Sequence, residues 1–487
     1  MTEPQETKRP SISRRSFHKA AATTFGAAAG FHFFPALADK KLEKPTLAGI
    51  GAGGKGLTDI SGAAKAGFHV VSLVDVVDIR KLGNAQGDKK ALSRLNKLEG
   101  ARNDHPDAVF YRDYREMLAE MGDKVDAVTV STPDHHHFHA SAMAMLAGKH
   151  VYCQKPLTHG IWEARMLNQL ASKTGVKTQM GNQAHANDHM RRCVELIRAG
   201  LVGKVKEIHA WTNRPIWPQG FAAPPEAEPV PDAIDWQQWC GPAPFVEYSS
   251  RIAPFAWRGW WDYGTGALGD MACHIMDMGY WAMDAKAVRS VQAKQAGATD
   301  LSPPINSVLT WEFDATPYSV ADGFSYHWYD GYIDAKFDRE SWQLIKNGDE
   351  YNHPSEDVLG DVDFSQFGSV VIGEEGKLFF NRSKNSWVLE SGASIDGFPW
   401  PSESLPRATG QNAYAEWMDA VKGDIDQAAS HFGHSGPMTE MILLGVIAQR
   451  NPDQKLVWDP AQMEIVGRSD LSKLVRRDYR PGWESPV

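Results

Sequence analysis

The sequence predicts a two-domain α/β protein, with a parallel sheet covered by helices in the first domain and a different kind of sheet in the second. The chain has 487 residues, which is more than one small hydrophobic core accommodates. Up to about residue 180, short apolar segments alternate with helical patterns, as in sheets whose strands are buried on both faces. Beyond about residue 200 the apolar segments are longer and partly alternate with polar residues, which favours a sheet with one covered face.

Five short strands connected by helices are expected in the first domain. The strand-like segments are β-rich, and the segments between them space Ala, Leu and Met as helices do. Strands are expected at residues 46–53, 69–76, 126–133, 150–156 and 176–183, and helices at 56–67, 114–122, 136–148 and 159–175. Ligands of such sheets bind beyond the carboxyl ends of the strands. Lys155, immediately before Pro156, stands at one of these ends.

The second domain is expected to combine longer strands with two C-terminal helices. Strands are predicted at residues 204–213, 288–295, 307–315, 368–380 and 386–391, and helices at 411–424 and 436–450. We expect the two C-terminal helices to pack back near the first domain. The segment 213–262 is rich in Pro, Gly and Trp, and its tryptophans indicate an ordered, functional region.

Composition excludes several classes of function. The net charge is −9 and opposite charges are interspersed, which argues against nucleic-acid binding. The four cysteines, Cys153, Cys193, Cys240 and Cys273, contain no CxxC spacing, so neither a redox motif nor a zinc staple is indicated.

The N-terminus predicts a cleaved export signal over residues 1–38. Arg14 and Arg15 precede Phe17 and a weakly apolar run, and Ala-Leu-Ala at 36–38 resembles a cleavage site. Paired arginines mark the export route that carries folded proteins, so the protein is expected in the periplasm or elsewhere outside the cytoplasm. A membrane anchor is the alternative, but the run is mostly Ala and Gly, and we expect no stable membrane insertion after cleavage.

A glycine-rich segment after the first strand predicts a dinucleotide site. Gly51, Gly53 and Gly56 fit the GxGxxG pattern, in which the glycines permit a tight turn, close approach of a pyrophosphate, and close packing of helix on strand. The start of the following helix offers unpaired N–H groups to phosphates. The pattern therefore predicts a Rossmann domain over residues 39–180, followed by a substrate and oligomerisation domain over residues 181–487.

Asp75, at the end of the second strand, favours NAD over NADP as the cofactor. A carboxylate at this place accepts hydrogen bonds from the adenosine ribose hydroxyls and repels a 2′-phosphate. Arg80, a few residues later, could still reach such a phosphate, so NADP stays open as the second choice.

Asp270 and His274 form a candidate acid–base pair. They are four residues apart, so a helix would place them on one face. A carboxylate beside an imidazole orients the ring and raises its proton affinity, which suits proton exchange with a substrate hydroxyl. The alternative is that the two residues only pair with each other or cap backbone groups. With Lys155, whose ammonium could polarise a carbonyl oxygen, they form a candidate catalytic group.

Three segments together resemble a known family. They are "GIGAGGKG", "STPDHHHFHASAMAMLAGKHVYCQKPL" and "GALGDMACHIMD", in this order. The chain after its signal resembles the glucose–fructose oxidoreductase / inositol dehydrogenase (Gfo/Idh/MocA) family. The resemblance implies a Rossmann domain followed by an α/β domain with a large, open, mostly antiparallel sheet. It also implies that Lys155 is the lysine of an E-K-P motif with a cis bond to Pro156, and that Asp270 and His274 are the D-x-x-x-H pair.

The resemblance also places Thr132, Pro133 and His137 against the cofactor. The chain departs from the family pattern at Gln154, where Glu is usual, so an amide replaces a charge. The residues expected to contact the cofactor are Gly51, Ala52, Gly53, Gly54, Lys55, Gly56, Asp75, Ser131, Thr132, Pro133, His137, Gln154 and Lys155.

The histidine run at residues 135–139 does not predict a metal site. Spacings of one and two place few of its rings on one helical face, and no carboxylate or cysteine follows in ligand register. One of these histidines near the nicotinamide, with the others at the start of a helix, is the preferred interpretation.

Aromatic residues before the Asp270 helix suggest a sugar pocket. Flat aromatic faces suit the apolar faces of sugars, although packing in the core or between subunits explains any single tryptophan equally well. Substrate contacts are predicted for Gln183, His185, Trp261 and Tyr263.

These features predict an exported oxidoreductase. It would transfer a hydride between a secondary alcohol of a sugar, sugar derivative or cyclitol and a tightly held nicotinamide cofactor that is recycled within the site. His274 would be the acid or base, Asp270 would orient it, and Lys155 would stabilise the alkoxide. The alternatives are a glycoside-cleaving enzyme that works by transient oxidation, elimination and re-reduction, and a non-catalytic sugar-binding protein. An open sheet with an apolar face favours a homodimer or homotetramer.

Overall fold

The computed structural model describes residues 42–78, 89–285, 288–361, 366–381, 386–389 and 401–487. The predicted signal, residues 1–38, and Arg80 lie outside these ranges. In the described part of the chain, no helix is both long and apolar enough to cross a bilayer.

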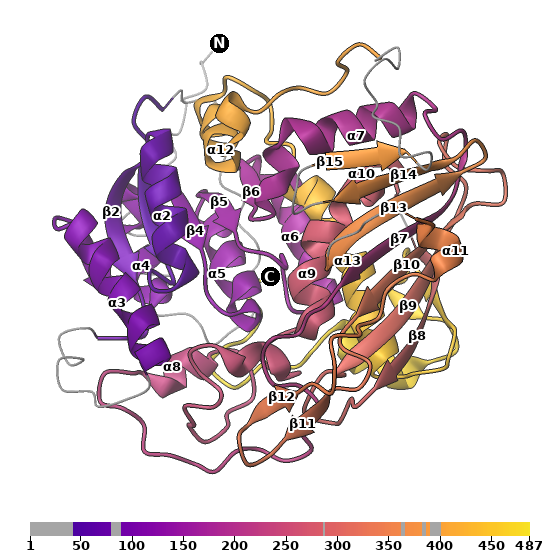
Figure 1. Ribbon diagram of the computed structural model, residues 1–487. Coiled ribbons are helices and arrows are strands. Elements are labelled where there is room, and N and C mark those ends of the chain that lie inside the picture. The colour runs from indigo at the N-terminus through magenta and orange to yellow at the C-terminus, as the bar shows by residue number, and fades with distance from the viewer. Residues whose placement is uncertain (1–41, 79–88, 286–287, 362–365, 382–385, 390–400) are drawn as a thin grey trace, which may run out of the picture.

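The first domain is a six-stranded parallel sheet with the strand order β3-β2-β1-β4-β5-β6 (Figure 1). This order reverses direction next to β1, which creates the crevice where dinucleotides bind in such sheets. The strands are β1 (Thr46–Ile50), β2 (His69–Val74), β3 (Val109–Tyr111), β4 (Ala127–Val130), β5 (His150–Cys153) and β6 (Thr178–Met180). The helices are α2 (Lys55–Ala66), α3 (Lys89–Asp104), α4 (Tyr114–Met121), α5 (Asp134–Leu146) and α6 (Ile161–Thr174). The predicted Rossmann fold of the first domain is confirmed.

Local capping explains where several helices begin and end. The side chain of Asp113 accepts a hydrogen bond from Arg115 N at the start of α4. Helix α2 ends at Gly67, whose φ of 115° is readily adopted only by glycine.

The second domain is built on a nine-stranded sheet, in which only β7 and β10 are parallel neighbours and all other pairs are antiparallel. The predicted large, mostly antiparallel sheet is therefore confirmed. In spatial order its strands are β15 (Ser386–Leu389), β14 (Lys377–Asn381), β13 (Phe367–Gly373), β7 (Val205–Thr212), β10 (Phe324–Asp330), β9 (Asn306–Phe313), β8 (Val288–Ala296), β16 (Leu456–Asp459) and β17 (Glu464–Ile465). A separate hairpin joins β11 (Lys336–Asp338) to β12 (Gln343–Ile345).

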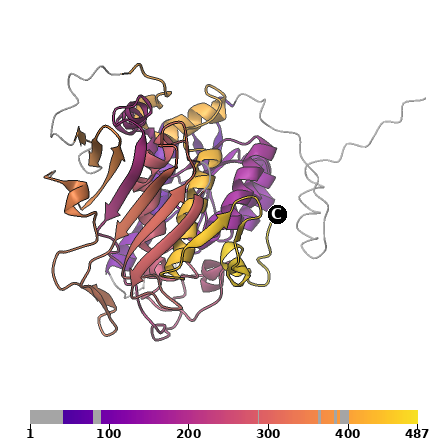
Figure 2. The ribbon, with the colours of Figure 1, turned by 90° about the vertical axis from the view of Figure 1, so that its right-hand side faces the viewer.

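One face of this sheet packs on helices that lie between it and the first domain (Figure 1). The helices of the second domain are α7 (Asp188–Arg198), α8 (Trp236–Cys240), α9 (Gly266–Ile275), α10 (Asp277–Ala282), α11 (Glu356–Leu359), α12 (Ala413–Lys422), α13 (Phe432–Gln449) and α14 (Ser472–Val475). Helix α9 contacts β7, and α13 contacts β8 and β9. Figure 2, seen from the side of the sheet, shows its strands in front of these helices.

The C-terminal helices also contact the first domain. Helix α13 packs on α6, and α12 packs on α2. Trp417 of α12 is fully buried and stacks on Phe68, with ring centroids 4.5 Å apart. One hydrophobic core therefore contains residues from both domains, and the second core cluster joins the first domain to α12.

Candidate functional site

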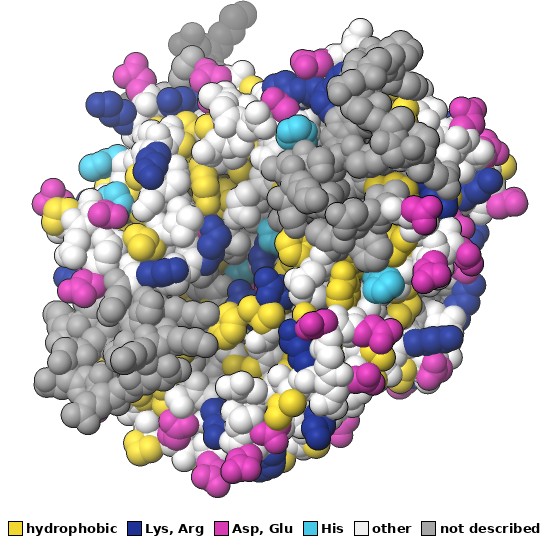
Figure 3. Space-filling model, viewed as in Figure 1, with side chains coloured by type: hydrophobic (Ala, Val, Ile, Leu, Met, Phe, Trp, Pro, Cys, Tyr) yellow, Lys and Arg dark blue, Asp and Glu magenta, His cyan; other side chains and the backbone are white. Residues whose placement is uncertain are grey.

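A cavity of about 1510 Å³ lies at the carboxyl ends of the first-domain strands and extends to the second domain. Its wall contains Gly51 after β1, Asp75 after β2, Thr132 after β4 and Lys155 after β5. Residues from α9, from the segment 213–262 and from the β11–β12 hairpin complete it. Figure 3 shows basic side chains gathered in a hollow near the centre of this face.

The glycine-rich turn has the shape that a dinucleotide requires. Gly51 has a φ of 78°, and a Cβ atom added to it would lie 2.8 Å from the carbonyl carbon of Ser131. A Cβ atom added to Gly56 would lie 1.7 Å from the Gly51 oxygen, so only glycine lets α2 pack this close to the turn. Helix α2 begins at Lys55 and presents its N-terminus to the cavity. The bare backbone and the helix start fit a pyrophosphate.

Asp75 is held in place by backbone amides of the same crevice. Its carboxylate accepts hydrogen bonds from Gly53 N at 2.8 Å and from Val77 N at 3.1 Å. Burial raises the pKa of Asp75, while these hydrogen bonds and the nearby Arg112 oppose the rise. The arrangement leaves a carboxyl group at the end of β2, where the ribose of a dinucleotide binds in this fold.

Gln154 is explained by a buried carboxylate that the sequence did not reveal. Its Nε2 donates to both oxygens of Asp59, at 3.1 and 3.0 Å. Asp59 is fully buried on α2 and also accepts hydrogen bonds from Ser131 Oγ at 2.7 Å and Tyr414 Oη at 2.7 Å. Lys55 forms an ion pair with it at 2.5 Å. A glutamate at position 154 would place two carboxylates together, so the amide is the group that fits beside Asp59.

We expect Gln154→Glu to lower the free energy of unfolding by about 1–3 kcal/mol, because the new carboxylate faces Asp59 without a donor. In the double variant Gln154→Glu, Asp59→Asn the carboxylate stands at position 154 and the amide at position 59. This pair can again form a hydrogen bond and should recover most of the lost free energy of unfolding. Urea unfolding followed by fluorescence measures both effects, with the exposed Gln462→Glu as the matched control. Equal stability of the single variant and the control would contradict the prediction.

Lys155 points towards the second domain and meets Asp270 of α9. Its Nζ lies 2.5 Å from Asp270 Oδ1 and 3.1 Å from the Asp270 carbonyl oxygen. Arg258 Nε donates to the same Oδ1 at 3.0 Å. Burial alone would raise the pKa of Asp270, but the Lys155 and Arg258 cations hold it below its ordinary value. The Lys155–Pro156 bond is cis, as the family resemblance implied.

His274 lies one turn after Asp270 on α9 and lines the same cavity as Lys155. The structure thus brings together the three residues for which a catalytic role was predicted. The carboxylate of Asp270 is engaged with Lys155 and Arg258. That Asp270 orients the His274 ring stays a prediction.

Asp134, the first residue of α5, is a second carboxyl group beside this cluster. It is buried, lines the cavity and accepts a hydrogen bond from Thr265 Oγ1 at 3.1 Å. Burial raises the pKa of Asp134 to about 7, although Arg258 and Lys155 oppose the rise. At neutral pH this group therefore exchanges a proton easily, next to the residues proposed for catalysis.

Asp134 should make the stability of the protein depend on pH. Its folded pKa of about 7 exceeds the ordinary value of 3.8, so between these values the folded protein keeps a proton that the unfolded chain loses. Its contribution to the free energy of unfolding should fall as pH rises through this window and then level off. Asp134→Asn removes the titration, so the stability difference between wild type and variant should change across the window. A constant difference in denaturant unfolding from pH 4.5 to 7.5 would contradict the prediction.

Most of the predicted cofactor residues line the cavity. They are Gly51, Gly53, Gly54, Lys55, Asp75, Ser131, Thr132, Pro133, Gln154 and Lys155. Ala52 and Gly56 are buried beneath the turn. His137 is buried behind the wall, where its two ring nitrogens lie 2.9 Å from the Thr132 oxygen and 2.8 Å from the Pro156 oxygen. It joins the two loops whose residues face the cavity.

Three of the four predicted substrate residues do not reach the cavity. His185 is fully buried, and its Nδ1 lies 2.8 Å from Asp277 Oδ2. Trp261 donates to the Thr299 oxygen and Tyr263 to the Pro244 oxygen, both at 2.9 Å within the protein interior. Only Gln183 lines the cavity. The predicted segment contributes other aromatic side chains to the cavity, among them Trp217, Trp239 and Trp257, and the β11–β12 hairpin adds Trp342.

The histidine run anchors α5 to distant segments. His135 and His136 lie 2.9 and 3.0 Å from the Trp239 oxygen, and His139 lies 3.0 Å from the Trp483 oxygen. Burial lowers the pKa of His136 to about 4 and that of His139 to about 3. These rings are therefore neutral hydrogen-bonding groups that fix the helix carrying Asp134.

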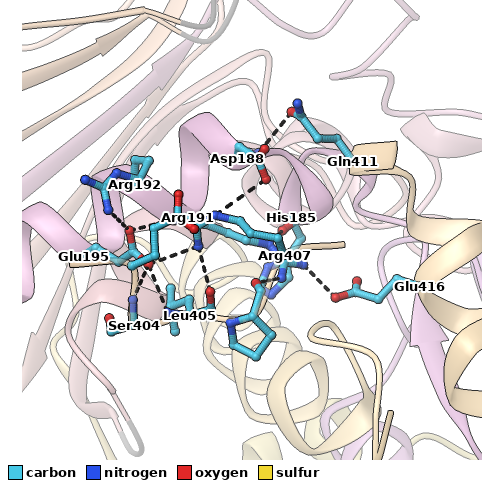
Figure 4. Close-up of polar contacts among 12 residues, drawn as sticks. His185, Asp188, Arg191, Arg192, Glu195, Ser404, Leu405, Arg407, Gln411 and Glu416 are labelled. Atoms are coloured by element: carbon cyan, nitrogen blue, oxygen red, sulfur yellow. Dashed lines mark hydrogen bonds and ion pairs between the residues drawn. The ribbon is translucent and has the colours of Figure 1, made fainter. Parts of the chain in front are cut away.

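A charged network joins several segments of the second domain (Figure 4). Arg191 of α7 is buried, and its Nη2 donates to Glu416 of α12 at 2.6 Å. Glu195, one turn later, accepts from Arg407 and from Arg192. Its burial would raise its pKa, but these hydrogen bonds lower it to about 2. The network joins α7 to the segment that leads into α12, whose Tyr414 reaches Asp59.

Sequence reasoning missed Asp59, Asp134, Arg258 and Tyr414. Asp59 lies on a helix that also carries Lys55 and Lys65, and Asp134 directly precedes the histidine run, so the sequence does not show that either carboxylate is buried. Arg258 stands alone among tryptophans, and its guanidinium carbon lies 4.2 Å from the centre of the Trp257 ring. For Tyr414, 355 residues from Asp59, the sequence gives no signal either.

Curated relatives match only part of this chain. D-xylose 1-dehydrogenase (NADP(+)) from Hypocrea jecorina is 31% identical over 128 residues, which are 26% of this chain and 31% of that protein. The chain aligns with 29% to 32% of the length of the first three relatives.

Solved structures share the fold across most of the chain. The WlbA dehydrogenase from Bordetella pertussis, in complex with NADH and UDP-GlcNAcA, is 16% identical, covers 86% of this chain and 99% of its own, and has a TM-score of 0.55. The aldose-aldose oxidoreductase from Caulobacter crescentus, complexed with glycerol, is 17% identical, covers 85% and 100%, and has a TM-score of 0.51.

Two family models match the first domain and the first part of the second domain. Residues 50–182 match the oxidoreductase family, NAD-binding Rossmann fold, and residues 195–313 match the oxidoreductase family, C-terminal alpha/beta domain. Together with the fold and the arrangement of the cavity, these matches show that the chain belongs to the Gfo/Idh/MocA family of oxidoreductases.

Proposed function

We propose that this protein is an NAD-dependent oxidoreductase that transfers a hydride between a secondary alcohol of a sugar, sugar derivative or cyclitol and a tightly held cofactor. The observation that carries the proposal is that Lys155, which Asp270 holds in place, and His274 line one cavity with the glycine-rich turn. A binding protein without chemistry would gain little from a lysine, an arginine and a carboxylate that are partly buried together, because desolvating charges is costly.

The residues of the first domain fit a bound dinucleotide. The Gly51 turn and the start of α2 would hold the pyrophosphate, and Asp75 would accept the ribose hydroxyls. Bound NAD supplies a hydride acceptor or donor at C4 of its nicotinamide ring. Since a carboxylate repels a 2′-phosphate, Asp75 favours NAD, although Arg112 lines the same cavity and could accommodate a phosphate.

The chain's own residues supply the proton and the charge balance. His274 would take the proton of the substrate hydroxyl during oxidation and return it during reduction. The Lys155 ammonium would stabilise the alkoxide, and its geometry is fixed by the bond to Asp270. Arg258 also donates to the Asp270 carboxylate. This second contact fixes the carboxylate, and the carboxylate in turn keeps the Lys155 ammonium at the cavity wall.

A sugar-like substrate is supported by the remaining wall and by the relatives. Trp217, Trp257 and Trp342 offer flat faces beside the basic groups. Among proteins similar to this one, one is named for D-xylose and one for aldoses.

We further propose export by the twin-arginine route and assembly into a homodimer or homotetramer. Paired Arg14 and Arg15 motivate the first proposal, and replacing both with lysine should retain the protein in the cytoplasm. Light scattering of the purified protein tests the second.

The decisive experiment releases the cofactor from purified protein by denaturation and identifies it by mass. We expect about one NAD per chain, and a loss of retention in Gly51→Val, whose side chain would enter the backbone of Ser131. The loaded protein is then incubated with sugars and with chromogenic glycosides without added NAD. Release of the aglycone without net oxidation would assign the transient-oxidation reaction instead. Absence of bound dinucleotide together with no binding of added NAD or NADP would refute the proposal.

A further inference from the structure

The outer face of the nine-stranded sheet carries a cluster of two imidazoles and one carboxylate. Ile208 and Ala210 of β7 point into the core, so Glu207 and His209, which alternate with them, point to the opposite face. His327 of β10 is paired directly with His209 in the parallel register of the two strands. Glu207 and His209 of β7 and His327 of β10 therefore lie next to one another on the outer face of the sheet.

The spacing of the three side chains is that of metal ligands. His209 Nε2 lies 3.1 Å and His327 Nε2 lies 3.8 Å from Glu207 Oε2, and all three ligand atoms lie within 4.8 Å of one another. A tetrahedral zinc ion with bonds of about 2.0–2.1 Å separates its ligand atoms by about 3.3 Å. Two of the three separations are therefore close to this value, and the two Nε2 atoms, which lie within 4.8 Å of each other, come together when the stacked rings tilt towards the ion.

The second nitrogen of each ring is held by a hydroxyl group. His209 Nδ1 lies 3.0 Å from Tyr329 Oη, and His327 Nδ1 lies 3.0 Å from Thr310 Oγ1. Partners of this kind fix the orientation of metal-binding histidines and leave the other nitrogen directed at the ion. The two rings lie parallel, with centroids 4.5 Å apart and an interplanar angle of 16°.

We propose that Glu207, His209 and His327 form a binding site for a divalent transition metal ion on the outer face of the large sheet. Two imidazoles and one carboxylate suit Zn²⁺ and, less selectively, Cu²⁺ or Ni²⁺. The Glu207 side chain is 44% exposed and that of His327 is 20% exposed, so an ion can enter and a water can complete its coordination. Ser325 Oγ forms a hydrogen bond of 2.8 Å with His327 Nε2, which an ion would replace, and this weak contact at the exposed edge of the cluster is easily given up.

A second cluster of possible ligands serves as an internal comparison. His185, Asp277 and His434 also lie within 4.8 Å of one another, but deep inside the protein. The Asp277 carboxylate already receives Asn182 Nδ2 at 2.7 Å, in addition to His185 at 2.8 Å and His434 at 3.0 Å. These hydrogen bonds satisfy the carboxylate, so this cluster has a structural role.

Equilibrium dialysis of tag-free protein against Zn²⁺, with the metal measured by elemental analysis, tests the proposal. Wild type should bind one ion per chain after stripping with a chelator. Glu207→Gln and His327→Gln should each weaken binding at least about tenfold, and Tyr329→Phe should do so to a smaller extent. The exposed His69→Gln and the interior His434→Gln should bind as wild type does.

Two results would overturn the proposal. One is wild-type protein that binds less than a tenth of an equivalent at micromolar Zn²⁺. The other is binding that disappears in His434→Gln while it persists in His327→Gln. Circular dichroism of each variant, without metal, verifies its fold, and the exposed position of Glu207 makes Glu207→Gln the variant least able to disturb it.

Discussion

Lys155→Ala should lower kcat by about 10²–10³-fold while the cofactor stays bound. Two contacts with Asp270 of α9 fix the ammonium, so its position is defined before substrate binds. Removing a donor that stabilises a developing alkoxide costs about this much in enzymes with comparable sites. Steady-state rates with an accepted sugar, together with the dinucleotide released on denaturation, measure the two parts of the prediction.

Two controls separate chemistry from structure in this experiment. Lys294→Ala changes an exposed lysine of β8 and should keep full activity. Lys155→Arg keeps the charge beside Asp270 and should restore stability without restoring the rate, because a guanidinium places its charge differently. A Lys155→Ala enzyme with a kcat within threefold of wild type would contradict the assigned role.

Arg191→Met should lower the free energy of unfolding by about 3–5 kcal/mol. Arg191 and Glu416 are both almost fully buried, and the bond of 2.6 Å between them is the link from α7 to α12. Removing one partner leaves the other charge buried without a counter-charge, and this lowers the free energy of unfolding more than removing both charges does. Thermal and urea unfolding, followed by fluorescence of the buried tryptophans, measure the loss.

A double-mutant cycle identifies the origin of that loss. Arg191→Met combined with Glu416→Leu should be more stable than Arg191→Met alone, because no charge then stays buried. Arg468→Met, which breaks an exposed pair with Asp470, should leave stability unchanged. If Arg191→Met and Arg468→Met unfold alike, the network in Figure 4 does not stabilise the second domain.

The sequence predicted those parts of the fold that depend on local patterns. The segment 46–67 contains an apolar strand, a glycine-rich turn and an amphipathic helix, and each is a local signal. Strand β10 was missed because Ser325, His327 and Tyr329 alternate with its core residues and do not read as a hydrophobic run. Residues 368–380 were predicted as one strand, but they form the β13–β14 hairpin, which turns at Gly376 with a φ of 149°.

For the site, the sequence predicted the residue types better than their surroundings. Lys155, Asp270 and His274 could be found because each belongs to a short motif. The pairing of Gln154 with Asp59, and of Asp270 with Arg258, joins segments that only the folded chain brings together. His185 was taken for a substrate residue because a histidine after a strand end looks accessible, but Asp277 and Trp281 enclose it in the interior.

Trp483, far along the chain, also lines the cavity of the candidate site. It stacks against Arg115, with the guanidinium carbon 3.9 Å from the ring centre, while Tyr414 holds Asp59 beneath the glycine-rich turn. During synthesis, residues 46–180 leave the ribosome long before these two side chains exist. The dinucleotide compartment can therefore acquire all of its walls only after Trp483 has been synthesised, long after the first domain is available.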